Sequence, residues 1–192
     1  MKLLHLDTSA LGANSVTREL SAAIVARWQD AVPGLVTEYR DLDANPLPHL
    51  TGNVLSGADA AAQAEGASLL EQFLASDVIV IGAPMYNFGI PSTLKAWIDR
   101  IAVAGKTFRY TEQGPEGLAG GRRVIIASGR GGVHGNGPTD FQENYLRQVF
   151  NFLGITDVAF VRAEGVAYSP QHRADALAAA HAAIPLPLRE AA

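Results

Sequence analysis

The 192-residue chain contains no cysteine. This absence excludes disulfide bonds, zinc–thiolate sites, iron–sulfur clusters and a catalytic thiol. The five histidines are scattered along the chain and lack the spacing of metal ligands, so no metal site is expected. Any redox chemistry must therefore come from a bound organic cofactor.

The chain also lacks runs of positive charge and long apolar runs. It has 19 acidic and 15 basic residues, a net charge of -4, and no cluster of Lys or Arg that would favour nucleic acid or an anionic membrane. No uncharged apolar run approaches the ~20 residues of a membrane span, and the first residues do not form a signal peptide. The sequence therefore predicts a soluble, cytoplasmic protein whose partners are small molecules.

Short apolar strands alternate with helices along the whole chain. Its length and its 48% hydrophobic content predict a single domain, residues 1–192. Periodicity predicts strands at 2–6, 35–42, 77–83, 122–128 and 157–163, helices at 17–28, 59–75, 91–104, 138–152 and 171–184, and a loop at 43–57. This alternation predicts a doubly wound α/β fold with a five-stranded parallel sheet, and it leaves both common strand orders open.

Ligands in such sheets bind beyond the carboxyl ends of the strands, so the loops after strands one, three and four are the candidate site. The first loop, "DTSALGANSVTREL", contains Ser9, Asn14, Ser15 and Thr17 where a helix begins. Hydroxyls and free backbone N–H groups at a helix N-terminus suit a phosphate. The alternative is simple N-capping by Ser15 or Asn14. Neither a G-x-G-x-x-G motif nor a P-loop is present.

The second loop, "APMYNFGIP", combines aromatic, apolar and amide side chains. Such a mixture would hold a flat heteroaromatic ring, with Met85, Tyr86 and Phe88 against its face and Asn87 and backbone N–H groups at its polar edge. Pro84, directly before Met85, helps to shape the turn. The alternative is that the aromatic side chains turn into the core.

The third loop, "ASGRGGVHGNGP", has glycine at 129, 131, 132, 135 and 137. Glycines let the backbone approach a ligand closely, and Arg130 adds a positive charge that would stabilise a reduced, anionic ring. The alternative is a mobile loop with Arg130 in solvent and His134 as an ordinary surface histidine. A phosphate loop, a ring loop and a donor loop on one edge together favour FMN as the ligand.

Several motifs carry a family resemblance: "DTSALGANSVTREL", "APMYNFGIPSTLKAWID", "GKTFRYTEQGPEGL", "RGGVHGNGPTD" and "FLGITDVAFVRAEGVAY". With these, nearly the whole chain resembles the bacterial FMN-dependent NADH azoreductases, also described as NADH:quinone oxidoreductases. The resemblance implies a flavodoxin-like fold and a homodimer with one FMN per subunit and active sites where the subunits meet. It also implies a ping-pong reaction in which NADH, with NADPH left open, reduces the cofactor and a quinone or azo compound is then reduced.

The resemblance also assigns residues. The phosphate contacts are Ser9, Ser15, Val16 and Thr17, and the ring contacts are Pro84, Met85, Tyr86, Asn87, Phe88, Ser128, Gly129, Arg130, Gly131 and Gly132. Substrate contacts are Phe88, Tyr110, His134 and Phe152, with core packing as the alternative for Phe152. No general acid is clearly encoded, so protons come either from water or from His134, the nearest candidate. The family often has Ser or Thr directly before R-G-G, where this chain has Gly129, and Val16 stands at an often polar position.

Two other functions stay open on the sequence. A flavodoxin-type electron carrier would also bind FMN, although such carriers are usually far more acidic than this chain. A flavin-free α/β interaction module is the third possibility. The apolar stretch "WIDRIAVAG", residues 97–105, gives a further reason to expect a dimer, since a helix this apolar suggests a covered face. The alternative is that the helix is buried in its own subunit.

Overall fold

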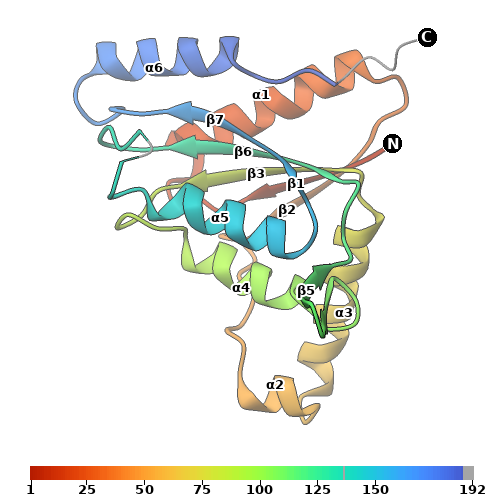
Figure 1. Ribbon diagram of the computed structural model, residues 1–192. Coiled ribbons are helices and arrows are strands. Elements are labelled where there is room, and N and C mark those ends of the chain that lie inside the picture. Colours follow the sequence, from red (N-terminus) through yellow and green to blue (C-terminus); the bar gives the residue numbers. More distant parts are fainter. Residues whose placement is uncertain (136, 188–192) are drawn as a thin grey trace.

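The computed structural model describes residues 1–135 and 137–187. Its central sheet has five parallel strands, β1 (Lys2–Asp7), β2 (Val36–Asp41), β3 (Val78–Pro84), β6 (Arg123–Gly129) and β7 (Asp157–Ala163). Their order across the sheet is β2-β1-β3-β6-β7, which is the flavodoxin-like order (Figure 1). The fold predicted from the sequence is therefore confirmed, and the structure decides between the two strand orders.

Helices cover both faces of this sheet (Figure 1). One face carries α1 (Val16–Ala31) and α6 (Pro170–Ala182), and the other carries α3 (Ala60–Ala75), α4 (Ser92–Ile101) and α5 (Phe141–Phe152). The five predicted helices are all present. Helix α5 begins at Phe141 rather than at residue 138 because Asp140 caps it, its carboxylate accepting the N–H of Glu143 at 3.0 Å.

Alternating side chains of the buried strands enter two separate cores. In β3, for example, Ile79 and Ile81 pack with α3, α4 and α5, whereas Val78 and Val80 pack with α1 and α6. Since both faces are covered, β3 is buried along its whole length, which explains its continuous apolar sequence.

Two segments differ from the expectation. Residues 43–57, predicted as a loop, contain the short helix α2 (Gly52–Ser56), which Thr51 caps at its start and Gly57 ends in the left-handed conformation with φ 83°. The chain between α4 and β6 forms a two-stranded antiparallel hairpin, β4 (Phe108–Thr111) and β5 (Gly114–Gly117). Strands this short, separated by two residues, carry too little periodicity to be recognised in the sequence.

The apolar stretch at 97–105 was expected to form a face covered by a second subunit, and the structure does not support this. Trp97, Ile98 and Ile101 are at most 3% exposed, because α4 packs into the core of its own subunit. Intramolecular burial therefore explains the composition of this helix.

Within the described residues, no helix combines the length and apolarity needed to cross a membrane.

Candidate functional site

A cavity of about 310 Å³ opens at the carboxyl edge of the sheet. The three loops singled out in the sequence contribute to it, together with the loop after β7 and the first turns of α6. Its wall includes these predicted residues: Ser9, Asn14, Ser15, Val16, Thr17, Pro84, Met85, Tyr86, Gly129, Arg130 and Gly131. It also includes residues that the sequence did not single out, namely Leu11, Val166, Ala167 and Arg173.

The N-terminus of α1 forms one side of the cavity. Ser15 caps this helix, its Oγ accepting the N–H of Arg18 at 3.3 Å and lying 3.1 Å from the Oγ1 of Thr17. The first N–H groups of a helix have no acceptor within the helix, and the helix dipole places partial positive charge there. The capping alternative is thus confirmed for Ser15, and capping leaves the N–H groups of the first turn available to an anion.

Arg18 connects the first loop to β2. Its Nη2 donates to the carbonyl oxygen of Ser9 at 2.8 Å, and its Nη1 lies 2.6 Å from the Oδ2 of Asp41. The hydrogen bond from Arg18 lowers the pKa of Asp41. Burial, together with the nearby carboxylates, raises the pKa of Tyr39 to about 12. Arg18 was not singled out from the sequence, because its carboxylate partner Asp41 lies on β2, 23 residues away.

The loop after β3 forms the adjoining side. The hydroxyl of Tyr86 lies 3.2 Å from the Oγ of Ser9 and accepts the N–H of Ala10 at 3.1 Å, so the first two loops are joined. Tyr86 and Gly89 exchange two backbone hydrogen bonds of 3.0 Å, which close a tight turn.

This turn presents its side chains outward. Asn87 and Phe88 lie between Tyr86 and Gly89 with positive φ angles of 49° and 69°, and Phe88 is 50% exposed. Met85 and Tyr86 are partly buried and line the cavity. The alternative that these aromatic side chains belong to the core is therefore wrong for Phe88.

The glycine loop approaches α1 closely at its start. A Cβ atom on Gly129 would lie 2.9 Å from the Cγ2 of Thr17, and one on Gly131 would lie 3.4 Å from the Cβ of Ala167. The unusual glycine before R-G-G is thus explained, because the Thr17 methyl group occupies the space that a side chain at 129 would need.

The same loop is tied to the segment after β7. One carboxylate oxygen of Glu164 accepts the N–H groups of His134 and Gly135 at 2.9 and 3.0 Å. Burial acts to raise the pKa of Glu164, but these two hydrogen bonds and the positive charge of Arg130 outweigh it and lower that pKa. The carboxylate is therefore held in its charged form.

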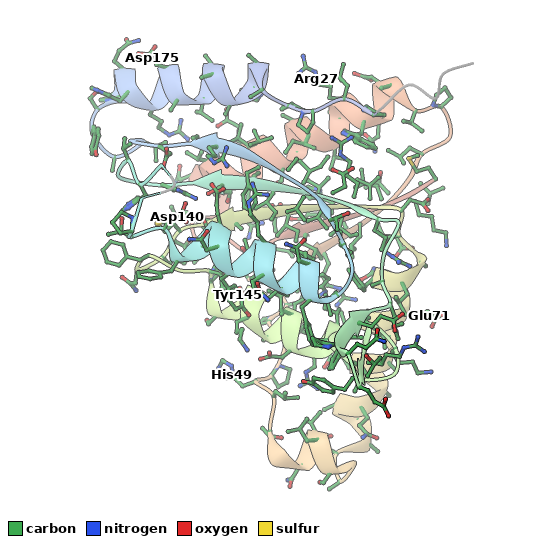
Figure 2. All side chains as sticks on the ribbon, viewed as in Figure 1. Arg27, His49, Glu71, Asp140, Tyr145 and Asp175 are labelled. Atoms are coloured by element: carbon green, nitrogen blue, oxygen red, sulfur yellow. The ribbon has the colours of Figure 1, made fainter. Side chains whose placement is uncertain are left out.

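The expectation that the side chain of Arg130 lies in solvent is wrong, and its charge is paired with carboxylates. It is 1% exposed, and its guanidinium contacts the carboxylates of Asp140, Glu143 and Glu164 at 2.9, 2.8 and 3.1 Å. It therefore neither points into solvent nor offers a free positive charge to a ligand. Figure 2 shows Asp140 at the start of α5, on the carboxyl side of the sheet.

Ser128 belongs to this buried network. Its Oγ accepts from the Nε of Arg130 at 3.1 Å and lies 2.8 Å from the Oε1 of Gln142. The Nε2 of Gln142 in turn donates to the carbonyl oxygens of Ala83 and Pro84 at 3.0 and 2.9 Å. The Ser128 hydroxyl is thus turned away from the cavity, contrary to its assignment as a ring contact.

Several other predicted residues lie outside the cavity wall, namely Asn87, Phe88, Gly132 and His134. Two of them meet nevertheless: the rings of Phe88 and His134 are nearly perpendicular, with centroids 5.8 Å apart. The Nδ1 of His134 lies 3.1 Å from the Oγ1 of Thr139.

Tyr110 and Phe152 lie elsewhere in the same chain. Tyr110 is 75% exposed on β4, and both rings contact Phe108, with centroid distances of 5.6 Å for Tyr110 and 4.5 Å for Phe152. The hairpin packs on the turn before β7, where a Cβ on Gly117 would lie 2.1 Å from the backbone nitrogen of Gly154. Figure 1 shows this hairpin at the opposite end of the sheet from the strand arrowheads.

A larger cavity of about 580 Å³ lies among α2, α3, α4 and Phe108. It contains none of the residues predicted for the site. The smaller cavity at the carboxyl edge is the candidate site, because the N-terminus of α1, the glycine loop and the turn after β3 all contribute to it.

Comparison with known proteins gives consistent results. A family profile described as a flavodoxin-like fold matches residues 1–185. The chain is 65% identical over 185 residues to an FMN-dependent NADH:quinone oxidoreductase from Stenotrophomonas maltophilia (strain K279a), covering 96% of this chain and 95% of that protein. It is 66% identical over 184 residues to FMN-dependent NADH:quinone oxidoreductase 1 from Xanthomonas axonopodis pv. citri (strain 306), with coverage of 96% and 95%.

Solved structures agree. The azoreductase from Bacillus anthracis str. Sterne has a TM-score of 0.87 and 30% identity over 95% of both chains. An FMN-dependent NADH-azoreductase from Bacillus anthracis str. Ames Ancestor, solved in complex with FMN, has a TM-score of 0.85 and 28% identity over 96% of both chains. The chain therefore belongs to the flavodoxin-like family. Within that family it groups with the FMN-dependent NADH:quinone oxidoreductases, as its motifs predicted.

Proposed function

We propose that the chain is an oxidoreductase that binds FMN, takes electrons from NADH and reduces quinones or azo compounds. The observation that supports this most strongly is the cavity itself, in which an anion-binding helix end and an aromatic turn lie on one edge of a flavodoxin-like sheet. The names of relatives more than 60% identical to this chain specify the same cofactor and electron donor.

The cavity suits the two ends of a flavin mononucleotide. Ser15, Thr17 and the N–H groups of the first turn of α1 would hold the phosphate, with Ser9 beside them. Met85 and Tyr86 would contact the ring, and Gly129 and Gly131 let the glycine loop lie close to Thr17 and Ala167 in the cavity wall. FMN, when bound, would supply two-electron redox chemistry by accepting hydride from NADH and passing electrons to the acceptor.

The residues around the ring would serve binding and orientation. Phe88 and Asn87 project from the turn after β3 and would flank the incoming substrate, with the imidazole of His134 against Phe88. A ping-pong order follows if NADH and the acceptor use this space in turn. His134 is the nearest imidazole to such a substrate and would be the proton donor.

Active sites formed between two copies of the chain complete the proposal. Tyr110 and Phe152 lie with the hairpin, away from the cavity of their own subunit, so they would wall the substrate pocket of a second copy. The high exposure of Tyr110, 75%, is consistent with a side chain that becomes covered on association.

Anaerobic mixing of FMN-loaded protein with NADH alone tests the enzymatic role. Loss of the yellow colour, and its return on adding a quinone or an azo dye, is expected. A yellow protein that NADH leaves unchanged would instead support an electron carrier, and a protein unable to bind FMN would support the interaction module. The same assay with NADPH gives the nucleotide preference.

Subunit complementation tests the shared site. A Ser15→Ala/Thr17→Ala chain and a Tyr110→Ala/Phe152→Ala chain would each be poorly active, and mixed dimers of the two would regain one intact site. No recovery of activity after mixing and reassociation, or a monomer of about 20.3 kDa that is fully active, would contradict it.

A further inference from the structure

The candidate cavity has an anion-binding end, and only some of its positive charge is free to act there. Two arginines, Arg130 and Arg173, are among the residues that line it. The guanidinium of Arg130 is offset by Asp140, Glu143 and Glu164, so it adds no net attraction for an anion. Arg173 is therefore the lining residue whose charge remains available.

Arg173 lies beside the first turn of α1. It is the fourth residue of α6, and its Nη2 is 3.7 Å from the Oε2 of Glu19, one helical turn after the cap residue Ser15. That separation is too long for a hydrogen bond, and the two side chains are 40% and 46% exposed. Such a pair is weak, so Arg173 can turn from Glu19 to a stronger anion at low cost.

We propose that Arg173 binds the phosphate of FMN and makes the site selective for FMN over unphosphorylated flavins. The inference rests on the proposed function, because it takes FMN as the ligand of this cavity. The helix N-terminus supplies hydrogen bonds but no formal charge, whereas the phosphate monoester carries a charge of about -1.5 to -2 at neutral pH. Arg173 supplies the matching charge from the neighbouring helix.

Glu19 has a defined part in this arrangement. In the free protein its carboxylate lies 3.7 Å from the Arg173 guanidinium, and it would compete with the phosphate for that group. Replacing it with the isosteric, neutral glutamine should therefore raise the affinity for FMN by about twofold. This gain should disappear when Arg173 is absent.

Binding of FMN and of riboflavin to the apoprotein, measured by quenching of flavin fluorescence, tests the proposal. Arg173→Ala should weaken FMN binding by about tenfold and leave riboflavin binding unchanged, because riboflavin has no phosphate. The effect should shrink as salt is added, since the contact is partly exposed. Arg173→Lys should retain part of the affinity.

Arg27→Ala is the matched control. Arg27 is an exposed arginine farther along α1, and its Nη1 donates to the carbonyl oxygen of His181 rather than lining the cavity (Figure 2). The Arg27→Ala variant should bind FMN and riboflavin with the affinities of the unaltered protein.

Four outcomes would overturn the inference. Two concern binding by Arg173→Ala: unchanged affinity for FMN, or an equal loss of affinity for FMN and riboflavin. The third is an equal loss of FMN affinity in Arg27→Ala, and the fourth is a changed KM for NADH in Arg173→Ala with unchanged FMN affinity. In each of these the proposed function stands, because the unaltered protein still binds FMN. An unaltered protein that binds no flavin would overturn the proposed function as well.

Discussion

The Cγ2 methyl group of Thr17 lies 2.9 Å from the point where a Cβ atom on Gly129 would sit. The first turn of α1 and the start of the glycine loop are thus packed directly against each other in the wall of the candidate cavity. A serine at 129 would overpack this contact and cost about 1–3 kcal/mol of unfolding free energy. Urea unfolding of Gly129→Ser measures that cost.

Thr17→Ser supplies the compensating change, since it removes the Cγ2 methyl and keeps the hydroxyl. The double variant Gly129→Ser/Thr17→Ser should recover most of the stability and FMN affinity that Gly129→Ser alone loses. Purely additive losses in the double variant would show that the two positions are not coupled.

Ser15→Ala should affect both folding and FMN binding. Loss of the N-cap at α1 should cost about 1 kcal/mol of unfolding free energy. Loss of a hydrogen bond to a charged group should cost about 1.5–3 kcal/mol of FMN binding free energy. Chemical unfolding of the apoprotein and flavin titration separate these effects.

The comparison variant for this test is Thr51→Ala, which removes the corresponding cap from α2, far from the cavity. It should reduce stability without changing FMN affinity. Equal FMN affinity in Ser15→Ala and the unaltered protein would argue against a phosphate at this helix.

Arg130 should matter chiefly for folding. Arg130→Met leaves the carboxylates of Asp140 and Glu164 without this cation, while Glu143 keeps its pair with Arg162. Breaking a buried ion-pair cluster in this way costs about 3–5 kcal/mol. Arg109→Met, which removes an exposed pair with Glu116, should change stability by less than about 0.5 kcal/mol. Equal unfolding midpoints for the two variants would contradict this assignment.

Glu164 should make the glycine loop sensitive to acid. Its pKa is lower in the folded protein than in the unfolded chain, so its stabilising effect is complete above the unfolded pKa, about 4.3, and is lost as pH falls through the folded value. Glu164→Gln should cost about 1–2 kcal/mol at pH 7 and should unfold with a shallower pH dependence below pH ~5.

Urea unfolding between pH 7 and pH 3 measures this difference. Glu116→Gln, in the exposed pair with Arg109, should follow the unaltered protein across that range. A pH dependence in Glu164→Gln identical to that of the unaltered protein would refute the role of the carboxylate.

The fold could be predicted from the sequence because its signals are local. The buried strand Val78–Pro84 is apolar along its length, and Ser15 stands where a helix begins. The candidate cavity followed from a general rule about parallel sheets, which needs only the order of strands and loops.

The errors arose where a contact joins residues distant in the sequence. Arg130 looked like a free charge because its partner Glu164 lies 34 residues away on another element. Arg173 was missed for the same reason, since its place in the cavity wall depends on how α6 packs over α1. The stretch at Trp97 looked like an interface because an apolar helix has the same sequence pattern whether its own core or a second subunit covers it. In the structure its own core covers it.

If Phe88 flanks the substrate as proposed, its left-handed backbone sets the stability of the fold against activity. A non-glycine residue in that region costs about 1–2 kcal/mol, and half of the side chain held there faces solvent, so its packing returns little of this cost. Selection for thermostability alone would therefore favour glycine at position 88. A laboratory lineage evolved for heat tolerance without an activity screen should lose this phenylalanine early and with it the aromatic wall beside His134.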